Sequence, residues 1–351
     1  MFDFILNLQL FAAGTVVNAT TSYVNADTGT TTPFSGDNTL SPGMKTYYDT
    51  ALLENARNEH YFTQFGKHVA LPAHHGRTIE MRKWNTLPNA PELQEGVIPT
   101  GEKMGQTTLT AALKQHGMFV AITDLLDLHY IDPVLQGATE ELGASAGETQ
   151  DILCRNELMT GTNVMYADTV DGDTVTTPTN YAGMSASNNR LTPSMVNKAA
   201  PWLKKCKAPK INGKYIAIIH PSVSFDLRES DGWIEAHKYA ATTEIFNGEI
   251  GELHGVRFVE TTNAKVTSQT LKDGTGMVYT CLFLGKDAYA VVDPEGGAME
   301  MIIKDKREAG GPLNQYSTAG YKFEDCTKIL YQERMLRVEC CSAFSTIDVA
   351  N

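Results

Sequence analysis

The stretch DPVLQGATEELGASAGETQDILCRNELM, from Asp132 to Met159, decides how this chain folds. Asp132 followed by Pro133 is typical of a helix start, because aspartate caps free backbone N–H groups and proline fits the first helical position. Small and apolar side chains then recur at spacings of three and four, as one face of a packed helix requires. They are Leu135, Ala138, Leu142, Ala146, Thr149 and Leu153. At 1.5 Å per residue the pattern predicts one helix about 40 Å long.

A β-hairpin is predicted directly before this helix, over residues 76–123. RTIEMRKW (77–84) alternates with period two, and TTLTAALKQHGMFVAIT (107–123) is a second strand-like run. The loop between them, Asn85 to Gly105, is rich in Pro, Gly and Glu and is longer than compact domains normally carry. We therefore expect the hairpin to project from the body and to bury apolar loop side chains on a neighbouring copy. Those side chains are Leu87, Leu93, Val97 and Ile98.

The first 44 residues are predicted to form an extended arm. Residues 13–44 are rich in Thr, Asn, Gly and Ser and show no periodicity. Their scattered apolar side chains, among them Val16, Val17 and Phe34, are expected to become ordered on a partner surface; a disordered terminus is the alternative. Residues 1–14 imitate a signal peptide but lack the basic residues that such a segment needs, so we do not expect it to direct export.

Two connecting segments and the end of the chain carry weaker patterns. Residues 45–75 are predicted to contain a docking helix, because the apolar side chains of TYYDTALLENARNEHYFTQF (46–65) fit one helical face. Residues 161–191 are rich in Thr, Asn, Asp and Gly and are expected to form a loop or small insertion. Residues 276–351 are expected to be mainly β. The strands predicted there are residues 277–284, 288–292 and 328–340.

An α/β region is predicted over residues 192–275. Thr192 and Pro193 mark the start of a helix, again as N-cap and first helical residue. The run YIAIIH (215–220) is continuously apolar and of strand length, and a helix over residues 221–229 follows it. This alternation indicates a buried strand flanked by helices.

Composition and charge narrow the classes of function. With 42% apolar and 20% charged residues among 351, the chain has enough apolar material for a core and is not a disordered sequence. Its net charge of −12 argues against a protein that grips nucleic acid through clustered basic residues, but not against a passive container. Six cysteines without CxxC spacing predict reduced thiols, with neither a zinc site nor a disulfide framework. No apolar stretch is long enough to cross a bilayer.

No catalytic, cofactor or metal site is predicted. His220-Pro221-Ser222 lies between a strand and a helix, where a nucleophile could be placed, but it lacks the Gly-x-Ser-x-Gly elbow of serine hydrolases. His220 is therefore expected to end the strand and Ser222 to belong to the helix N-terminus. The glycines of GEIGELHG (248–255) fit neither the phosphate loop nor the dinucleotide motif. A hydrolase that uses His220 and Ser222 is the enzyme alternative.

Three segments carry a resemblance to a known family. They are NLQLFA (Asn7–Ala12), NGEIGELHGVRFVETTNA (Asn247–Ala264) and GGPLNQYSTAGYKFEDCTKILYQERMLRVECCSA (Gly310–Ala343). The second resembles the end of the A-domain, and the third the closing strands, of major capsid proteins of tailed bacteriophages with the HK97-type fold. The match is in particular to the N4-like family. The first is similar to the opening of structural proteins in phages of Gram-positive hosts.

The resemblance implies an α+β, HK97-type capsid fold. The parts would be an N-terminal arm (1–44), a docking helix and connection (45–75), an extended hairpin or E-loop (76–123), a P-domain with the spine helix (124–160), a loop or insertion (161–191), an A-domain (192–275) and closing strands (276–351).

The resemblance further implies a function without enzymatic activity or cofactor. The chain would be a major capsid protein that assembles through pentamers and hexamers into the icosahedral virion head around phage double-stranded DNA. The expected partners are further copies, scaffolding and portal proteins and DNA held without sequence specificity, with no membrane, and assembly in the host cytoplasm. The alternative of the same fold is a nanocompartment shell, which cargo enzymes in place of a genome would reveal.

Overall fold

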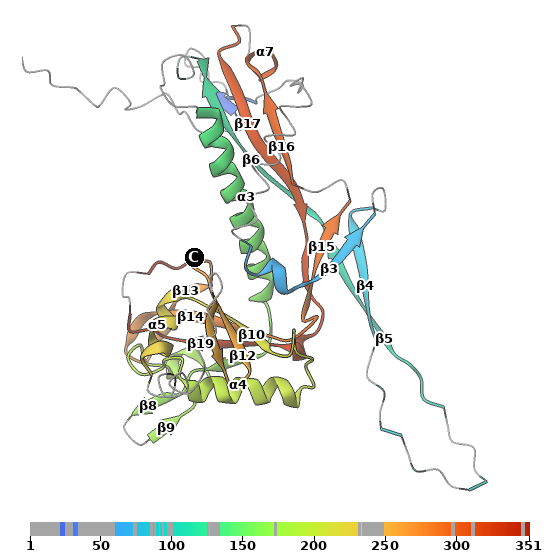
Figure 1. The fold of residues 1–351 in the computed structure, drawn as a ribbon, viewed down its shortest axis with the longest axis vertical. Helices are drawn as coiled ribbons and strands as arrows, with labels where there is room; N and C mark the ends of the chain where they lie inside the picture. Colours follow the sequence, from blue (N-terminus) through green and yellow to red (C-terminus); the bar gives the residue numbers. More distant parts are fainter. Residues whose placement is uncertain are drawn as a thin grey trace, which may run out of the picture. The chain divides into compact units, whose positions relative to one another are not determined.

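The computed structural model describes residues 22–24, 31–33, 60–72, 76–84, 87, 89–90, 92, 95–96, 101–124, 126, 134–171, 174–230, 233, 249–295, 299–309, 313–344 and 348–351 (Figure 1). Within them the chain forms two compact units. The first draws on residues 1–59, 115–149 and 296–324, and the second on residues 60–114, 150–295 and 325–351. Both units therefore combine segments that are distant in sequence.

The first unit contains a three-stranded sheet with the order β16–β17–β6. The backbones of β6 and β17 approach so closely that a Cβ on Gly117 would lie 2.7 Å from the Tyr321 carbonyl oxygen. Ser145 of helix α3 lies 3.3 Å from the Tyr321 hydroxyl, so the helix contacts this sheet (Figure 1). The elements of the unit are β1 (Ser22–Val24) paired with β2 (Thr31–Pro33), β6 (Lys114–Thr123), the first part of α3 (Val134–Leu158), β16 (Glu300–Lys304), α7 (Lys306–Ala309) and β17 (Tyr316–Asp325).

The second unit is built on a seven-stranded sheet. Six strands follow one another in the order β11–β12–β10–β14–β19–β7, and β13 pairs with β14. They are β7 (Val164–Tyr166), β10 (Tyr215–Ile219), β11 (Glu249–Leu253), β12 (Val256–Glu260), β13 (Val266–Leu271), β14 (Gly274–Leu284) and β19 (Met335–Cys340). The pairs β10–β12 and β19–β7 are parallel and the others antiparallel, so the sheet is mixed.

Both faces of this sheet are buried. The odd-numbered residues of β10 lie in a cluster formed with α4 (Pro193–Lys205) and α5 (Pro221–Glu229). The even-numbered residues lie in a second cluster, which includes Cys154 and Leu158 of α3 and the ring of Tyr289. A strand buried on both faces reads as a continuous apolar run, which explains the sequence YIAIIH.

A smaller sheet in the second unit supports a hairpin. Its order is β18–β15–β3, and the hairpin strands β4 and β5 pair with each other only. Met81, Ala111 and Leu113 at the base of the hairpin share a buried cluster with Ala290 and Val292 of β15. The elements are η2 (Thr63–Phe65), β3 (Lys67–Leu71), β4 (Thr78–Trp84), β5 (Gln106–Ala112), β8 (Thr169–Asp171) paired with β9 (Thr174–Thr176), η3 (Tyr181–Gly183), β15 (Tyr289–Pro294), β18 (Thr327–Ile329) and η4 (Gln332–Arg334).

Several predicted elements are confirmed. The long helix α3 ends at Leu158, one residue before the predicted limit, and α5 covers residues 221–229 as predicted. Thr192 caps α4 by accepting a hydrogen bond from the Met195 N–H at 3.4 Å, with Pro193 as the first helical residue. The cap predicted at Asp132 lies outside the described residues.

Two strand predictions are wrong for the same reason. The run 107–123 is two strands, β5 and β6, because the chain leaves one sheet at Leu113 and enters another. The run 328–340 is likewise divided into β18 and β19 by the 3-10 turn η4. No Gly or Pro stands at either break, so the local pattern does not reveal that the two parts of each run join different sheets.

Two connecting segments differ from the simplest expectation. Residues 161–191 contain β7, which pairs with β19, and the fully buried Asn189, so only the β8–β9 hairpin has the character of an insertion. The predicted docking helix lies mostly outside the described residues. Its last three residues form the 3-10 turn η2 rather than the end of an α-helix.

A buried carboxylate holds the segment before β3 against α3. Asp151 Oδ1 accepts hydrogen bonds from the backbone N–H groups of Tyr61 at 2.9 Å and Phe62 at 2.6 Å. Asp151 Oδ2 has no hydrogen-bond partner among the described residues. Burial raises the pKa of Asp151 to about 6, although the backbone hydrogen bonds act in the opposite direction. Burial also raises the pKa of Asp325 to about 6.

We expect the ionisation of Asp151 to lower the free energy of unfolding as the pH rises from about 4 to about 7, and Asp151→Asn to remove this contribution. Folding raises the pKa of Asp151 from 3.8 to about 6. The contribution of Asp151 to stability is therefore complete below its pKa in the unfolded state, and it is lost as the pH rises through its pKa in the folded state. Asparagine keeps an acceptor oxygen and does not ionise. The variant should gain up to about 3 kcal/mol relative to the wild type across this range, measured by urea unfolding of soluble subunits.

The exposed Glu148 of the same helix provides the control, Glu148→Gln, which should leave the pH dependence unchanged. If wild type and Asp151→Asn lose stability in parallel, Asp151 does not titrate in this range.

Candidate functional site

The outer end of the hairpin β4–β5 presents exposed apolar side chains. The strands pair in register from Thr78 opposite Ala112 to Trp84 opposite Gln106, and Figure 1 shows them extending away from β3 and β15. Trp84 is 55% exposed, and Leu87 and Met104 are 52% and 58% exposed. Every described residue from 87 to 104 is exposed. These apolar groups belong to no buried cluster among the described residues. Exposed apolar side chains of this kind are typical of a surface that another molecule covers.

The paired strands of the hairpin are fixed to the body from their base as far as Lys83. The Lys83 ammonium lies 4.5 Å from the centroid of the Tyr331 ring and 3.4 Å from a Glu333 carboxylate oxygen. The Arg334 guanidinium lies 3.9 Å from the centroid of the same ring. Cation–π pairs of this kind are worth about 0.5–2 kcal/mol each, depending on exposure. Together with the buried cluster around Met81, they set the direction in which the hairpin leaves the body.

One of the predicted contact residues, Leu87, lies among the described residues, where it is exposed. The others lie outside the described residues: Leu93, Val97 and Ile98 in the loop, and Val16, Val17 and Phe34 in the arm. Sequence reasoning missed Trp84 and Met104. The signal for Trp84 was present, because it follows Thr78, Glu80 and Arg82 on the polar face of the strand, where an aromatic side chain has no core to enter.

The residues of the hydrolase alternative do come together at the start of α5, but their hydrogen bonds do not suit catalysis. Ser222 Oγ donates to Asp348 Oδ2 at 2.7 Å. His220 Nδ1 accepts the backbone N–H of Ser222 at 3.2 Å and so caps the helix. A serine nucleophile needs the imidazole as its proton acceptor, with the carboxylate orienting that imidazole. The geometry therefore does not support a hydrolase.

This cluster instead holds the last described segment of the chain. The Tyr279 hydroxyl also donates to Asp348, and burial followed by this contact raises the pKa of Tyr279 well above its usual value. Burial lowers the pKa of His220, while the carboxylates of Asp348 and Glu260 act in the opposite direction. Ser342 Oγ donates to the Ser222 carbonyl at 2.9 Å. The polar groups thus attach the chain after β19 to α5.

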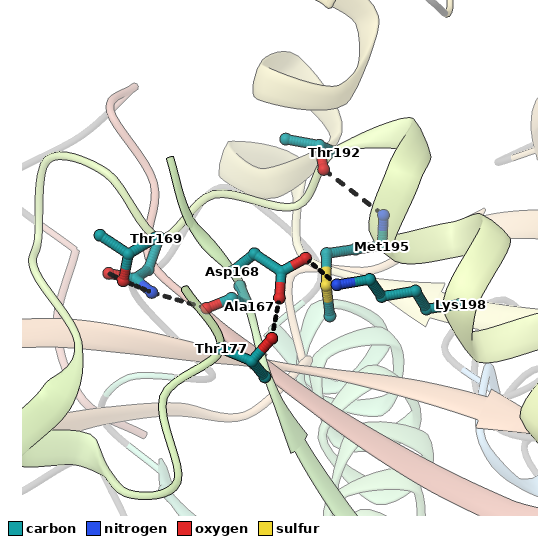
Figure 2. Close-up of polar contacts among 8 residues, drawn as sticks. Ala167, Asp168, Thr169, Thr177, Thr192, Met195 and Lys198 are labelled. Carbon is teal, nitrogen blue, oxygen red and sulfur yellow. Dashed lines mark hydrogen bonds and ion pairs between the residues drawn. The ribbon is translucent and has the colours of Figure 1, made fainter. Parts of the chain in front are cut away.

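A second buried polar network joins the β8–β9 hairpin to α4 (Figure 2). Asp168 is 4% exposed and accepts hydrogen bonds from Thr177 Oγ1 at 2.7 Å and from the Lys198 ammonium. Asn189 donates from Nδ2 to the Ala167 carbonyl at 2.6 Å and accepts the Ser185 N–H at the same distance. Both oxygens of Asp168 have protein partners, so this network is a structural link and not a ligand site.

Two further kinds of site concern metal ions and membranes. Among the described residues, no three His, Cys, Asp or Glu side chains are placed to hold a metal ion together. None of the helices described there combines the length and the apolar character that crossing a membrane requires. The exposed hairpin is therefore the candidate functional site.

Comparison with known proteins identifies the fold. No family model and no curated protein sequence matches the chain. Solved structures do match. One is a chain of the capsid of Ralstonia phage GP4, with a TM-score of 0.61 and 14% identity, covering 81% of this chain and 91% of that chain. Another belongs to the cyanophage Pam1 capsid, with a TM-score of 0.60 and 13% identity, covering 98% of this chain and 100% of that chain.

The capsid of cyanophage P-SCSP1u gives a TM-score of 0.58 at 12% identity, over 80% of this chain and 87% of that chain. The likeness extends over most of each chain in all three cases. The chain therefore has the α+β, HK97-type capsid fold that the sequence predicts.

We expect purified protein not to be labelled at Ser222 by a fluorophosphonate probe, because the hydroxyl donates to Asp348 and His220 Nδ1 accepts the backbone N–H instead of the hydroxyl proton. Intact-mass spectrometry measures the labelling, with a known serine hydrolase as the positive control. His220→Ala should lower the stability by about 1 kcal/mol through loss of the cap, without changing the labelling. Stoichiometric labelling that His220→Ala abolishes would restore the hydrolase alternative.

Proposed function

We propose that this chain is the major capsid protein of a tailed bacteriophage, and that many copies of it assemble into the closed shell of the virion head. The observation that carries the proposal is the likeness to phage capsid chains along nearly the whole length of the protein. A partial likeness would fit a shared domain in an unrelated protein. A likeness that covers 98% of this chain and all of the Pam1 capsid chain supports the same use of the whole chain.

The hairpin supports the proposal on physical grounds. Trp84, Leu87 and Met104 are about half exposed in the subunit and lie at the end of an element whose base is fixed. Covering large apolar side chains contributes about 1.5–3 kcal/mol each when the burial is complete. In a symmetric shell the same contact repeats at every subunit, so a modest energy per copy stabilises the whole assembly.

The parts of the fold then have the following assignments. The hairpin β4–β5 with its loop is the E-loop, α3 is the spine helix of the P-domain together with β6, β16 and β17, and the seven-stranded sheet with α4 and α5 is the A-domain. Residues 1–44 are the arm, and residues 45–75 connect it to the E-loop. In this assignment β6 belongs to the P-domain, so the E-loop ends near Ala112 rather than at Thr123.

The finer parts of the proposal concern assembly and partners. The subunits form pentamers and hexamers, assemble in the host cytoplasm with scaffolding and portal proteins, and enclose double-stranded DNA without reading its sequence. Contacts through Val16, Val17 and Phe34 of the arm and through Leu93, Val97 and Ile98 of the loop belong to the same proposal. Membership of the N4-like family stays a prediction from the sequence motifs.

The direct test is assembly of the purified protein. We expect expression with its scaffolding protein to give closed particles of uniform size, seen as one fast-sedimenting peak in a sucrose gradient and by light scattering. A homogeneous monomer across salt and protein concentrations, with the scaffold present, would contradict the proposal. Cargo enzymes rather than nuclease-protected DNA inside native particles would favour the nanocompartment alternative.

The hairpin loop should matter for assembly and not for folding. Replacing residues 85–105 by a short Gly-Ser turn should leave the unfolding temperature of soluble subunits unchanged, because every described residue of the loop except Gly105 is exposed. Particle yield should fall at least about tenfold, since the apolar contacts that each copy would make are lost.

A matched control is Val170→Ser with Val175→Ser, which removes an exposed apolar pair from the β8–β9 hairpin and should leave the yield unchanged. Normal particle yield without the 85–105 loop would show that the β4–β5 hairpin is not an intersubunit element.

A further inference from the structure

Charge is strongly segregated along this acidic chain. Between residues 115 and 154 there are seven Asp and Glu residues and no Lys or Arg. Between residues 190 and 214 there are seven Lys and Arg residues and no Asp or Glu. In a protein of net charge −12, the second block is the exception that needs an explanation.

The structure converts the basic block into a surface patch. Lys204 and Lys205 lie in the last turn of α4, and Lys207 and Lys210 follow in the loop to β10. Lys286 joins them, because its backbone N–H donates to the Pro209 carbonyl at 2.9 Å. All five lysine side chains are exposed. We call these five residues the lysine patch.

The patch carries charge that its own unit does not neutralise among the described residues. Lys198 and Lys214 in the same block pair with Asp168 and Glu252, whereas no ion pair is formed by the five lysines within the described part of the second unit. Cations at a helix C-terminus are stabilised by the helix dipole, which accounts for Lys204 and Lys205. It does not account for Lys207, Lys210 and Lys286, whose exposed ammonium groups are free to meet an anionic surface from outside the described part of the unit.

The acidic block supplies a surface of opposite charge on the other unit. Glu140, Glu141 and Glu148 are the exposed carboxylates of the first part of α3, and Glu141 and Glu148 are two helical turns apart on one face. None of the three forms an ion pair with another described residue, and Gln136 is the described partner of Glu140. We call these three residues the glutamate stripe.

We propose that the lysine patch of one copy binds the glutamate stripe of a second copy, as a heterologous electrostatic contact between neighbouring subunits. This inference rests on the proposed function, since it names a contact within the shell. The argument is charge complementarity: the lysine patch and the glutamate stripe form no ion pair with other described residues, and a heterologous contact places one against the other.

The balance of charge favours a second copy over nucleic acid as the occupant. Subunits of net charge −12 repel one another, and opposite charges that meet where copies touch offset part of this repulsion. A polyanion such as DNA would be attracted by the patch but repelled by the acidic remainder of the same subunit. The glutamate stripe is present in every copy and at the local concentration of the assembly.

Charge reversal tests the contact in solution with full-length protein. The patch variant carries Lys204→Glu, Lys207→Glu and Lys210→Glu, and the stripe variant carries Glu140→Lys, Glu141→Lys and Glu148→Lys. Each alone should lower particle yield at least about tenfold, because like charges then face each other. A control with the same change in net charge as the patch variant is Lys67→Glu with Lys114→Glu and Lys272→Glu, three exposed lysines elsewhere, which should assemble normally.

Mixing the two variants makes the test specific for a contact between copies. A patch variant offers an acidic patch that matches the basic stripe of a stripe variant, so a tagged patch variant should capture the stripe variant at low salt and release it in about 1 M salt. It should not capture another patch variant. Circular dichroism and thermal unfolding of each variant establish that the subunits are folded.

The outcomes separate this inference from the proposed function. Normal assembly of both single-surface variants, or failure of the mixture to associate, overturns the inference even if wild-type particles form. Patch variants that assemble normally but retain less DNA overturn it in favour of a nucleic-acid contact. Wild-type protein that forms no particles while the mixed variants still associate leaves the contact standing and overturns the proposed function.

Discussion

Burial of both faces of the seven-stranded sheet is the constraint on which the rest of the second unit depends. Alternate residues of β10 and β14 enter two separate apolar clusters, so each face must be covered. One face is covered by α4 and α5. The other is covered by the end of α3, by Tyr289 and by Phe62. Segments that are distant in sequence are thereby drawn onto one sheet, and the chain cannot fold as consecutive independent pieces.

The covering of the second face also sets up the exposed hairpin. Phe62 is held there by the Asp151 carboxylate, which accepts its N–H, and by the Tyr289 hydroxyl, which donates to its carbonyl. β3 follows directly and pairs with β15, whose Ala290 and Val292 pack against the base of β4–β5. These core contacts lead from Phe62 through β3 and β15 to the hairpin, in which Trp84 and Leu87 are exposed to solvent. The contacts that stabilise the subunit therefore also position the exposed apolar end of the hairpin.

The sequence predicts the helices and strands that depend on a local pattern, and it does not predict which strands pair with each other. The helix α3 and the strand β10 follow from spacing and from a continuous apolar run, and the Thr192 cap from a two-residue signal. The division of 107–123 at Leu113 does not follow, because no Gly or Pro marks the break and the two halves join different sheets. The strand β7 does not follow either, because it lies in a segment rich in Thr and Asn and is defined by its pairing with β19, which is distant in sequence.

The candidate site shows the same division. The sequence indicates Leu87 as a contact residue, because it is apolar and lies in a loop too long for a compact domain. Trp84 lies on the polar face of a predicted strand, and the prediction did not treat it as an exposed contact residue. The resemblance in the closing strands identified the fold before any structural comparison, and composition alone would have given only a globular α+β protein. Neither source indicated that Ser222 would donate to Asp348 rather than to His220, since Asp348 is 126 residues away in sequence.

The account depends most on the claim that the hairpin end is covered by a neighbouring subunit in a closed shell. A cryo-electron microscopy map of the purified particle, at a resolution that traces side chains, tests it most directly. The account predicts an icosahedral shell in which Trp84, Leu87 and Met104 lie against the surface of an adjacent copy. A shell in which the β4–β5 hairpin projects into solvent, or a preparation without closed particles, would contradict it.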